Sequence, residues 1–370
     1  MRQGALAVPR RQLGDGTFGA RDVPTAVVGL PDETVALTAN TYGTCALGSS
    51  GNVHCWGLNM WGQLGAGNNP GIQQCEWTGG APAECANTPL AVATIGDITD
   101  LSAAGPATTC ALTAGGTVWC WGFNDNGELG NGDPVGPQQC GPTEYTSNCG
   151  ASPVQVALDE TVISLGCGCA VTDAGSLWCW GENQSGRLGE GAEEGPEKCQ
   201  VTHSCAPTPW QVAGLDGTDM VEVGGSTGHT CAVDASGMVQ CWGSNTYGQL
   251  GVGDDEGRLK PTPVTGDHQF VALSVSGVAS CAIDDTGALW CWGDNRGGQL
   301  ALGTLAGPQA CDGALGSPGT ACALSPQASL EFGVLVEVKL GPWASGGCAL
   351  TDANHLYCWD GGAPVPTRVL

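Results

Sequence analysis

The sequence predicts an all-β protein, a β-propeller built from four-stranded blades. One observation is a repeat: the tripeptide Cys-Trp-Gly, or its variant Cys-Trp-Asp, occurs six times, and each copy follows another cysteine by ten residues. A second observation is composition, because 62 of the 370 residues are glycine and only 13% are charged. Short apolar stretches between glycine-rich turns, repeated many times, are typical of propellers and disfavour long helices.

Four short strands are expected in each repeat, in a fixed order. The first is an apolar stretch such as Met220–Gly225, the second is Cys-Ala followed by Leu, Val or Ile, and the third is the stretch that ends in Cys-Trp-Gly. An Asn-x-x-Gly-x-Leu block and a variable connector follow in the first five repeats. The fourth strand begins at a proline, such as Pro89 or Pro153. Glycine-rich turns separate these stretches.

The six repeats, with an additional N-terminal part, divide the whole chain. We expect one domain that consists of a partial repeat with an outer strand over 1–32 and six repeats over 33–93, 94–157, 158–213, 214–265, 266–331 and 332–370. The chain opens inside a repeat, at Arg11–Gly16 and Pro24–Val28, and the last repeat lacks the Asn-x-x-Gly-x-Leu block. Either six complete blades carry a spare N-terminal strand, or a seventh blade is incomplete in this chain.

The ten-residue cysteine spacing predicts cross-strand disulfides. A five-residue turn over 48–52 places Cys45 opposite Cys55, and directly opposite residues at a non-hydrogen-bonded site lie ~4.5 Å apart at Cα, within disulfide reach. A zinc site would need four converging ligands, which two cysteines facing each other in a hairpin do not supply. The predicted hairpin pairs are Cys45–Cys55, Cys110–Cys120, Cys169–Cys179, Cys231–Cys241, Cys281–Cys291 and Cys348–Cys358.

Eight further cysteines form local pairs in the connectors. The interval from Cys231 to Cys281, 50 residues, is the shortest between repeats and the only one without such a pair. The connectors that contain a cysteine pair are therefore the longer ones. A cross-link in a long connector removes chain entropy. The connector pairs are Cys75–Cys85, Cys140–Cys149, Cys199–Cys205 and Cys311–Cys322, which leaves Cys167 as the cysteine expected to be unpaired.

The blocks Trp56–Gly65 and Trp242–Gly251, the proline-led strand and Gly228–Val233 together resemble the regulator-of-chromosome-condensation repeat family, also described as alpha-tubulin-suppressor-like repeats. The resemblance spans nearly the whole chain and implies a propeller, commonly of seven blades. The founding members are nuclear exchange factors for a small GTPase, bound to chromatin. That activity is not expected here, because the acidic charge does not suit chromatin and about ten disulfides exclude the nucleus. Fold alone does not transfer function either. Secreted bacterial propellers of this repeat class, some of which look like protein inhibitors of β-lactamases, are a closer parallel.

The net charge and the cysteine content limit which partners and which cellular compartment suit this protein. With 36 acidic and 11 basic residues the formal charge is −25, which repels phosphate backbones and anionic membrane surfaces. For this reason no nucleic-acid binding is expected. No apolar run reaches the ~18 residues of a spanning helix, so no membrane insertion is expected either. Ten disulfides indicate an oxidising compartment. We expect a secreted, periplasmic or cell-surface protein whose signal peptide is not in this chain.

No residue pattern indicates catalysis or a cofactor. The five histidines lack a matching Ser or Cys with Asp at recognisable spacing, so no catalytic, cofactor-binding or metal-binding residue is predicted. Acidic clusters at Glu190–Glu194 and Asp254–Glu256 would suit Ca²⁺, but they lack the spaced pattern of a calcium loop, and solvated loops are expected instead.

The tryptophans divide into repeated and unrepeated positions. Those after the second hairpin cysteine recur with the repeat and are expected in the core. Trp119, Trp178 and Trp290 lie two residues earlier on the same face and should add to that layer. Trp61 and Trp77 do not repeat and lie in or beside the first connector, where they are candidate contacts for a partner. The six core tryptophans are Trp56, Trp121, Trp180, Trp242, Trp292 and Trp359.

These observations favour an extracellular binding scaffold that recognises a protein or another macromolecule through its disulfide-tied connectors, since loops on one face of a repeat array diversify while the blades stay constant. Two alternatives stay open. One is a propeller enzyme, a lyase or hydrolase that uses acidic loop residues. The other is a purely structural module of a longer surface protein.

Overall fold

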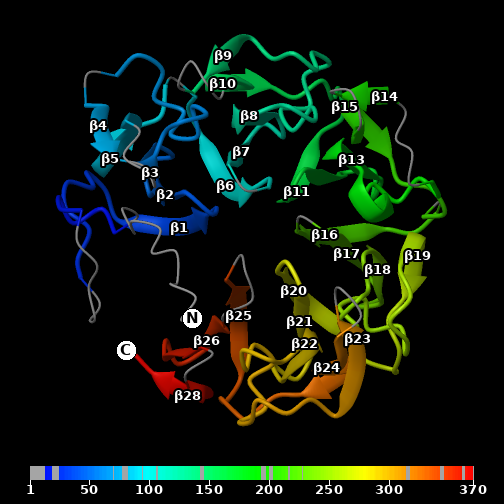
Figure 1. Ribbon diagram of the computed structural model, residues 1–370. Helices are drawn as coiled ribbons and strands as arrows, with labels where there is room; N and C mark the ends of the chain where they lie inside the picture. The colour runs from blue at the N-terminus through cyan, green and yellow to red at the C-terminus, as the bar shows by residue number, and fades with distance from the viewer. Residues whose placement is uncertain are drawn as a thin grey trace. The chain divides into compact units, whose positions relative to one another are not determined.

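The protein folds into six antiparallel sheets that follow one another along the chain (Figure 1). Each sheet is one blade of an all-β propeller, as the repeat predicted. Contacts divide the chain into an N-terminal unit, Met1–Asp159, and a C-terminal unit, Glu160–Leu370. The computed structural model describes residues 13–18, 25–69, 71–76, 82–93, 95–105, 107–141, 146–192, 197–199, 203–215, 217–226, 228–313, 317–341, 346–360 and 363–369.

The N-terminal unit contains the first two blades, each with five strands. The first blade has the strand order β1-β2-β3-β5-β4 and the second β6-β7-β8-β10-β9. The strands are β1 (Thr34–Ala39), β2 (Gly43–Gly48), β3 (Val53–Leu58), β4 (Gln73–Glu76), β5 (Pro82–Ala91), β6 (Ile98–Ala103), β7 (Thr108–Thr113), β8 (Val118–Phe123), β9 (Gln138–Cys140) and β10 (Ser147–Gln155).

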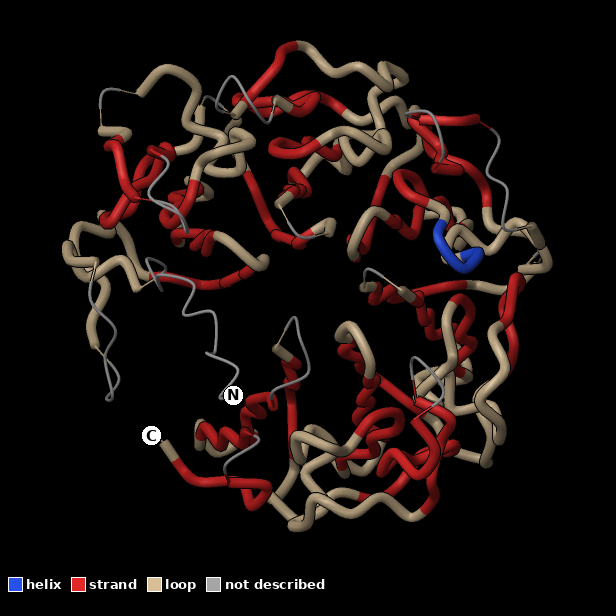
Figure 2. Tube along the Cα trace, viewed as in Figure 1, coloured by secondary structure: helices blue, strands red, loops and turns tan. Residues whose placement is uncertain are grey.

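The C-terminal unit contains four blades, of which the first and third have five strands and the others four. In the described part of the chain, the one helix is the short 3-10 turn η1 (Gln184–Gly186), blue in Figure 2. The strands are β11 (Val162–Gly166), β12 (Cys169–Thr172), β13 (Leu177–Glu182), β14 (Glu197–Cys199), β15 (His203–Gln211), β16 (Met220–Gly225), β17 (His229–Asp234), β18 (Val239–Gly243), β19 (Arg258–Pro263), β20 (Phe270–Val275), β21 (Ala279–Asp284), β22 (Leu289–Asp294), β23 (Gln309–Gly313), β24 (Ser317–Ala328), β25 (Leu335–Leu340), β26 (Gly346–Thr351), β27 (Leu356–Asp360) and β28 (Ala363–Arg368).

The hairpin register agrees with the cysteine spacing. In the first blade Cys45 lies opposite Cys55 and Leu47 opposite Val53, as the five-residue turn requires. All six hairpin pairs are disulfides in the structure, with Cα atoms 4.0–4.1 Å apart. In the first five blades these cysteines are at most 2% exposed. The disulfides therefore belong to the core, where they tie the second strand of each blade to the third.

Trp121, Trp242 and Trp292 each pack on a glycine of the preceding repeat, whereas the residue at that position before Trp359 is Ala301. A Cβ at Gly65 would lie 2.7 Å from the Trp121 ring, and one at Gly251 would lie 2.8 Å from the Trp292 ring. Both glycines have positive φ, 63° and 68°, a region that glycine enters without strain. The Trp121 indole N–H donates to the Gln63 carbonyl at 3.1 Å. In these three cases the Gly-x-Leu-Gly block of one blade forms the seat for the tryptophan of the next.

The N-terminal segment supplies that seat for the first blade. Gly14 has a φ of 69°, and a Cβ there would lie 2.9 Å from the Trp56 indole nitrogen. The Val28 N–H donates to the Gly14 carbonyl, as the Ala93 N–H does to that of Gly65. Residues 25–32 form no strand, however, whereas the sequence predicted an outer strand there. The partial repeat is therefore used for its turn.

The strand count is the main difference from the sequence prediction, which gave four strands to every repeat. The four blades whose connector carries a cysteine pair have a fifth strand at the edge, and the two blades without such a pair have four strands. Each sheet lies within one of the six predicted repeat ranges. The assignment of the whole chain to one domain stays a prediction.

Candidate binding surface

A buried asparagine holds the start of each connector. The Asn245 side-chain oxygen accepts the backbone N–H of Leu250 at 2.9 Å, and its amide donates to the carbonyls of Asp254 and Glu256. Asn295 repeats this pattern with Leu300, and both asparagines are at most 1% exposed. Because one side chain satisfies three backbone groups, the connectors of the fourth and fifth blades leave from the same anchored turn. The other members of the set are Asn59, Asn124 and Asn183.

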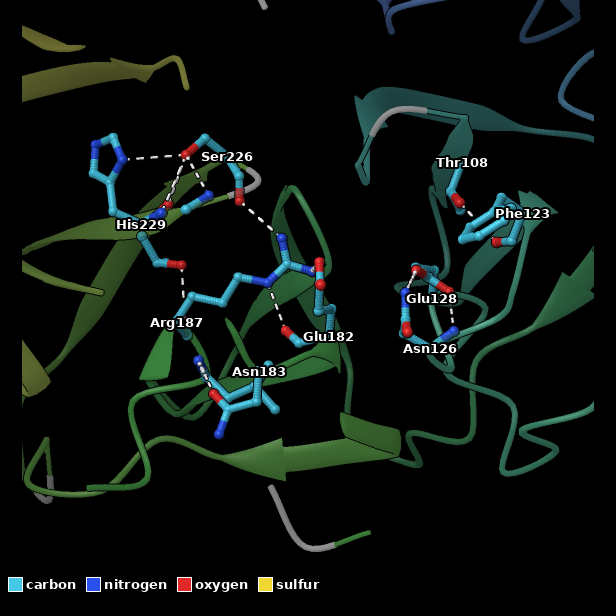
Figure 3. Close-up of polar contacts among 12 residues, drawn as sticks. Thr108, Phe123, Asn126, Glu128, Glu182, Asn183, Arg187, Ser226 and His229 are labelled. Carbon is cyan, nitrogen blue, oxygen red and sulfur yellow. Dashed lines mark hydrogen bonds and ion pairs between the residues drawn. The ribbon is translucent and has the colours of Figure 1, made fainter. Parts of the chain in front are cut away.

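The residue directly before each of these leucines varies in charge from repeat to repeat. Gln249 and Gln299 accept a backbone N–H within the turn, and Glu128 accepts the backbone and side-chain N–H groups of Asn126. Arg187 occupies the same position in the third blade, where its guanidinium donates to the carbonyls of Glu182 and Ser226 (Figure 3). The Arg187 side chain therefore joins the third blade to the fourth.

His229 lies beside this contact and is completely buried. Its Nδ1 lies 3.1 Å from the Ser226 hydroxyl (Figure 3). Its Nε2 lies 2.7 Å from the Ser280 hydroxyl of the next blade. Ser280 in turn donates to the Gln249 carbonyl. Burial lowers the pKa of His229 to about 3, so the imidazole is neutral at physiological pH. This histidine is a packing element between two blades.

The connectors are disulfide-tied β-hairpins at the blade edge, a finding that replaces the loops expected from sequence. In the first blade Cys75 lies opposite Ala83 and Cys85 lies opposite Gln73, so the disulfide crosses the strands diagonally. The other three connectors share this register, and in all four the Cα atoms of the pair lie 5.8–6.0 Å apart. One construction is therefore repeated four times.

The two sides of these hairpins differ. Successive strand residues point to opposite faces, so the residues next to the cysteines point away from the disulfide. They form one cross-strand pair per connector, and no two pairs are alike. The pairs are Gln74–Glu84, Gln139–Asn148, Lys198–Ser204 and Ala310–Ala321. A constant cysteine side thus supports a side that varies from blade to blade.

The two tryptophans proposed as partner contacts have different outcomes. Trp61 is half-buried and packs against Tyr42 and Phe123, with ring centroids 5.2 and 6.0 Å away. Its ring therefore lies between the first and second blades, and a contact with a partner stays a prediction. Trp77 lies outside the described residues. Trp119, Trp178 and Trp290 are half-buried, and Trp290 packs against the core cluster that contains Trp292. The indoles of Trp178 and Trp290 donate to Glu160 and Asp284.

Residues of both acidic clusters form hydrogen bonds or ion pairs with other residues of the same chain. Asp254 lies 2.6 Å from Arg258, and this hydrogen bond holds the pKa of Asp254 below its usual value. Glu190 accepts the Asn183 amide at 2.9 Å, and burial raises its pKa. The residues 193–196 lie outside the described part. Among the described residues, no group of three His, Cys, Asp or Glu side chains converges in a way that could hold a metal ion.

Cys167 is the one cysteine outside the ten disulfides. It lies half-buried in the tight turn between β11 and β12, with a φ of 31°. In addition, none of the described helices is long and apolar enough to cross a membrane.

Sequence reasoning missed the anchoring asparagines and the blade-linking roles of Arg187 and His229. The asparagine had a signal, because it follows Cys-Trp-Gly at the same distance in five repeats. The other two occur once each, so no periodicity marks them. Only the packing of neighbouring blades shows what their side chains contact.

Comparison with known proteins places the repeat in a family. Two family models, each described as the regulator of chromosome condensation (RCC1) repeat, match residues 98–128, 221–249 and 270–299 and residues 115–172, 174–233 and 236–283. The human E3 ubiquitin-protein ligase HERC2 is 28% identical over 258 residues, which are 69% of this chain and 5% of HERC2. The Ultraviolet-B receptor UVR8 of Arabidopsis thaliana is 30% identical over 271 residues, 72% of this chain and 53% of UVR8.

Solved structures agree in fold at low sequence identity. Yeast RCC1 (Prp20), crystallised bound to Kap60, superposes with a TM-score of 0.67 and 18% identity, over 91% of this chain and 75% of the yeast chain. Human WBSCR16 also has a TM-score of 0.67 and 18% identity, over 92% of this chain and 83% of the human one. The six blades and the matched repeats agree, and the chain belongs to the regulator of chromosome condensation (RCC1) repeat family.

Proposed function

We propose that the protein is a binding scaffold that recognises another protein through its four connector hairpins, in an oxidising compartment outside the cytoplasm. The observation that carries the proposal is the two-sided construction of these hairpins. Their cysteine side is the same in four blades, and the pairs on the opposite side all differ. A constant support that carries a different pair in each blade is the arrangement expected of a recognition surface.

The disulfides support binding because they hold the hairpins in one conformation before a partner arrives. An ordered surface loses less entropy on association, which lowers the cost of binding. Ten disulfides within one chain also support the compartment, since thiols stay reduced in the cytosol. Secretion, the periplasm and the cell surface all satisfy this condition.

The family relatives are consistent with a binding role but do not name the partner. Yeast RCC1 was crystallised with Kap60, and a second title for the yeast protein mentions binding to Gsp1p and histones. Histones and other nuclear partners do not suit a chain with ten disulfides. The ligase activity in the name of HERC2 belongs to a protein of which the matched region is 5%.

The fourth blade provides a control for the experiment, because its connector has no cysteine pair and its sheet ends at β19. A variant in which the four hairpin connectors are replaced by residues 252–260 should fold with six four-stranded blades. Both proteins would be used as bait in the extracellular fraction of the organism that makes them. A protein retained by the native chain and lost from the variant, at an unchanged melting temperature, supports recognition.

The competing role of the connectors is protection of the blade edges against proteolysis and edge-to-edge pairing. In that case the variant would retain the same proteins as the native chain and would be cleaved faster by trypsin. That pair of results would contradict the proposed function.

A further inference from the structure

A second surface lies at the opposite ends of the strands from the connectors. In the C-terminal unit, antiparallel pairing places the start of each inner strand beside the hairpin turn of its own blade, as Met220 lies opposite Asp234. We call this surface the turn face. It consists of residues 160–163, 173–176, 217–221, 234–238, 265–271, 284–288, 329–336 and 351–355.

Backbone hydrogen bonds join the turn face from blade to blade. The Phe270 N–H donates to the Gly237 carbonyl at 2.9 Å, and the Leu335 N–H donates to the Gly287 carbonyl at 3.0 Å. Within a blade, the Ala235 N–H donates to the Asp219 carbonyl at 2.9 Å. Each hairpin turn is thus bonded to the next inner strand, so the exposed residues of neighbouring blades lie on one continuous surface.

Apolar side chains are exposed at the same place in every blade of this unit. The inner strand has a β-bulge one residue after its start, and a bulge redirects the side chain at that position. Seven of the eleven exposed large apolar residues among the described residues of this unit lie on the turn face. The four bulge residues are Ile163 (50% exposed), Val221 (43%), Val271 (60%) and Val336 (54%).

Carboxylates surround these apolar residues. The described residues of the turn face contain no Lys or Arg, because the cations of this unit lie after the Cys-Trp-Gly strands, in β25 and at the end of β28. This separation of charge makes the turn face acidic and apolar at the same time. The exposed carboxylates are Asp173, Asp219, Asp267, Asp285, Glu331 and Asp352.

We propose that the turn face of the C-terminal unit docks a basic polypeptide segment in which Lys or Arg alternate with aliphatic side chains. The exposed valines and isoleucine would bury the aliphatic side chains, and the surrounding carboxylates would pair with the cations. Phosphate-bearing partners and anionic membranes are repelled by the same charges. The site is separate from the connectors, so it is independent of the proposed function.

The test uses a fluorescent dodecapeptide of alternating Lys and Leu, with fluorescence anisotropy as the measurement. One variant combines Val221→Ser, Val271→Ser and Val336→Ser, and a second combines Asp219→Asn, Asp267→Asn and Asp285→Asn. Their matched controls lie on the connector side: Leu305→Ser with Val365→Ser, and Glu197→Gln with Asp255→Asn and Glu256→Gln. Asp255 is half-buried and the other side chains are exposed, and circular dichroism would verify the fold of each variant.

The proposal predicts that each turn-face variant weakens peptide binding about tenfold, while each control changes it less than about twofold. A dodecapeptide of alternating Lys and Ser should bind about tenfold more weakly than the Lys–Leu peptide. Equal losses in the carboxylate variant and its control would show attraction to the net charge alone. Equal binding of the two peptides would show that the apolar residues take no part. Either result would overturn the proposal.

Discussion

Replacing His229 with threonine should make the protein less sensitive to acid. The second blade of the same chain has Thr108 at the corresponding position, directly before the second-strand Thr-Cys pair, where its hydroxyl donates to the Phe123 carbonyl. The fold therefore already accommodates threonine there. The substitution removes the only completely buried imidazole and its contacts with Ser226 and Ser280 among the described residues.

The size of the effect follows from the pKa of the buried ring. Burial lowers the pKa of His229 from 6.5 to about 3, whereas the unfolded chain takes up the proton near pH 6.5. A lowered pKa means that the stabilisation is fully present above pH 6.5 and is lost as the pH falls toward 3. At pH 4.5, two units below the pKa of the unfolded imidazole, the ring is protonated in the unfolded chain and neutral in the folded one. His229 should then cost the native chain about 3 kcal/mol of unfolding free energy relative to pH 7.5.

The assay is urea denaturation at pH 7.5 and pH 4.5, followed by tryptophan fluorescence with the disulfides intact. At pH 7.5 the His229→Thr variant should be less stable by about 1–3 kcal/mol, because a cavity forms and two hydroxyls lose a partner. At pH 4.5 the difference between the two proteins should vanish or reverse. A His355→Asn variant, at a half-buried turn position, serves as the control and should keep the acid sensitivity of the native chain. Parallel losses in native protein and His229→Thr would refute the reasoning.

Three further substitutions test the construction of the blades. Asn245→Ala leaves the Leu250 N–H and two carbonyls without their partner and should cost about 2–3 kcal/mol in urea denaturation; a loss under 0.5 kcal/mol would contradict the anchoring role. Gly251→Ala should cost about 1–3 kcal/mol more than Gly214→Ala, since both have positive φ but only Gly251 lies against a tryptophan; equal Tm values would be inconsistent with the seat. The double substitution Cys75→Ser with Cys85→Ser should lower the free energy of unfolding by about 3 kcal/mol. Limited proteolysis should then cut the first connector before β1–β3, and uniform cleavage would exclude an independent hairpin.

Much of the fold is encoded locally and could be predicted from the sequence. A turn of five residues between Cys45 and Cys55 determines their register, because strand residues alternate and the pairing has one solution. The connector strands could not be predicted in this way. β9 and β14 have three residues each and contain Gln, Glu and Lys, so neither length nor apolar alternation distinguishes them from loop. The neighbouring strand and the diagonal disulfide provide their structure.

The binding surfaces were predicted only in part. The connectors could be named as a candidate surface because their lengths and cysteines vary along the repeat. The bulge residues of the turn face could not, because Val221 and Val271 belong to apolar stretches that the sequence places inside a blade. Their exposure depends on the bulge and on where the preceding blade ends. Those features arise from packing between repeats, which the sequence of one repeat does not contain.

The central claim is a propeller whose ten disulfides tie each blade and order its connectors in an oxidising compartment. Peptide mapping of the natively produced protein, digested without reduction after alkylation of free thiols, tests it most directly. The account predicts an intact mass lower by the twenty hydrogens of ten disulfides, with Cys75 linked to Cys85 and each hairpin cysteine linked to the cysteine ten residues away. Alkylated hairpin cysteines in the native protein would contradict both the covalent framework and the compartment.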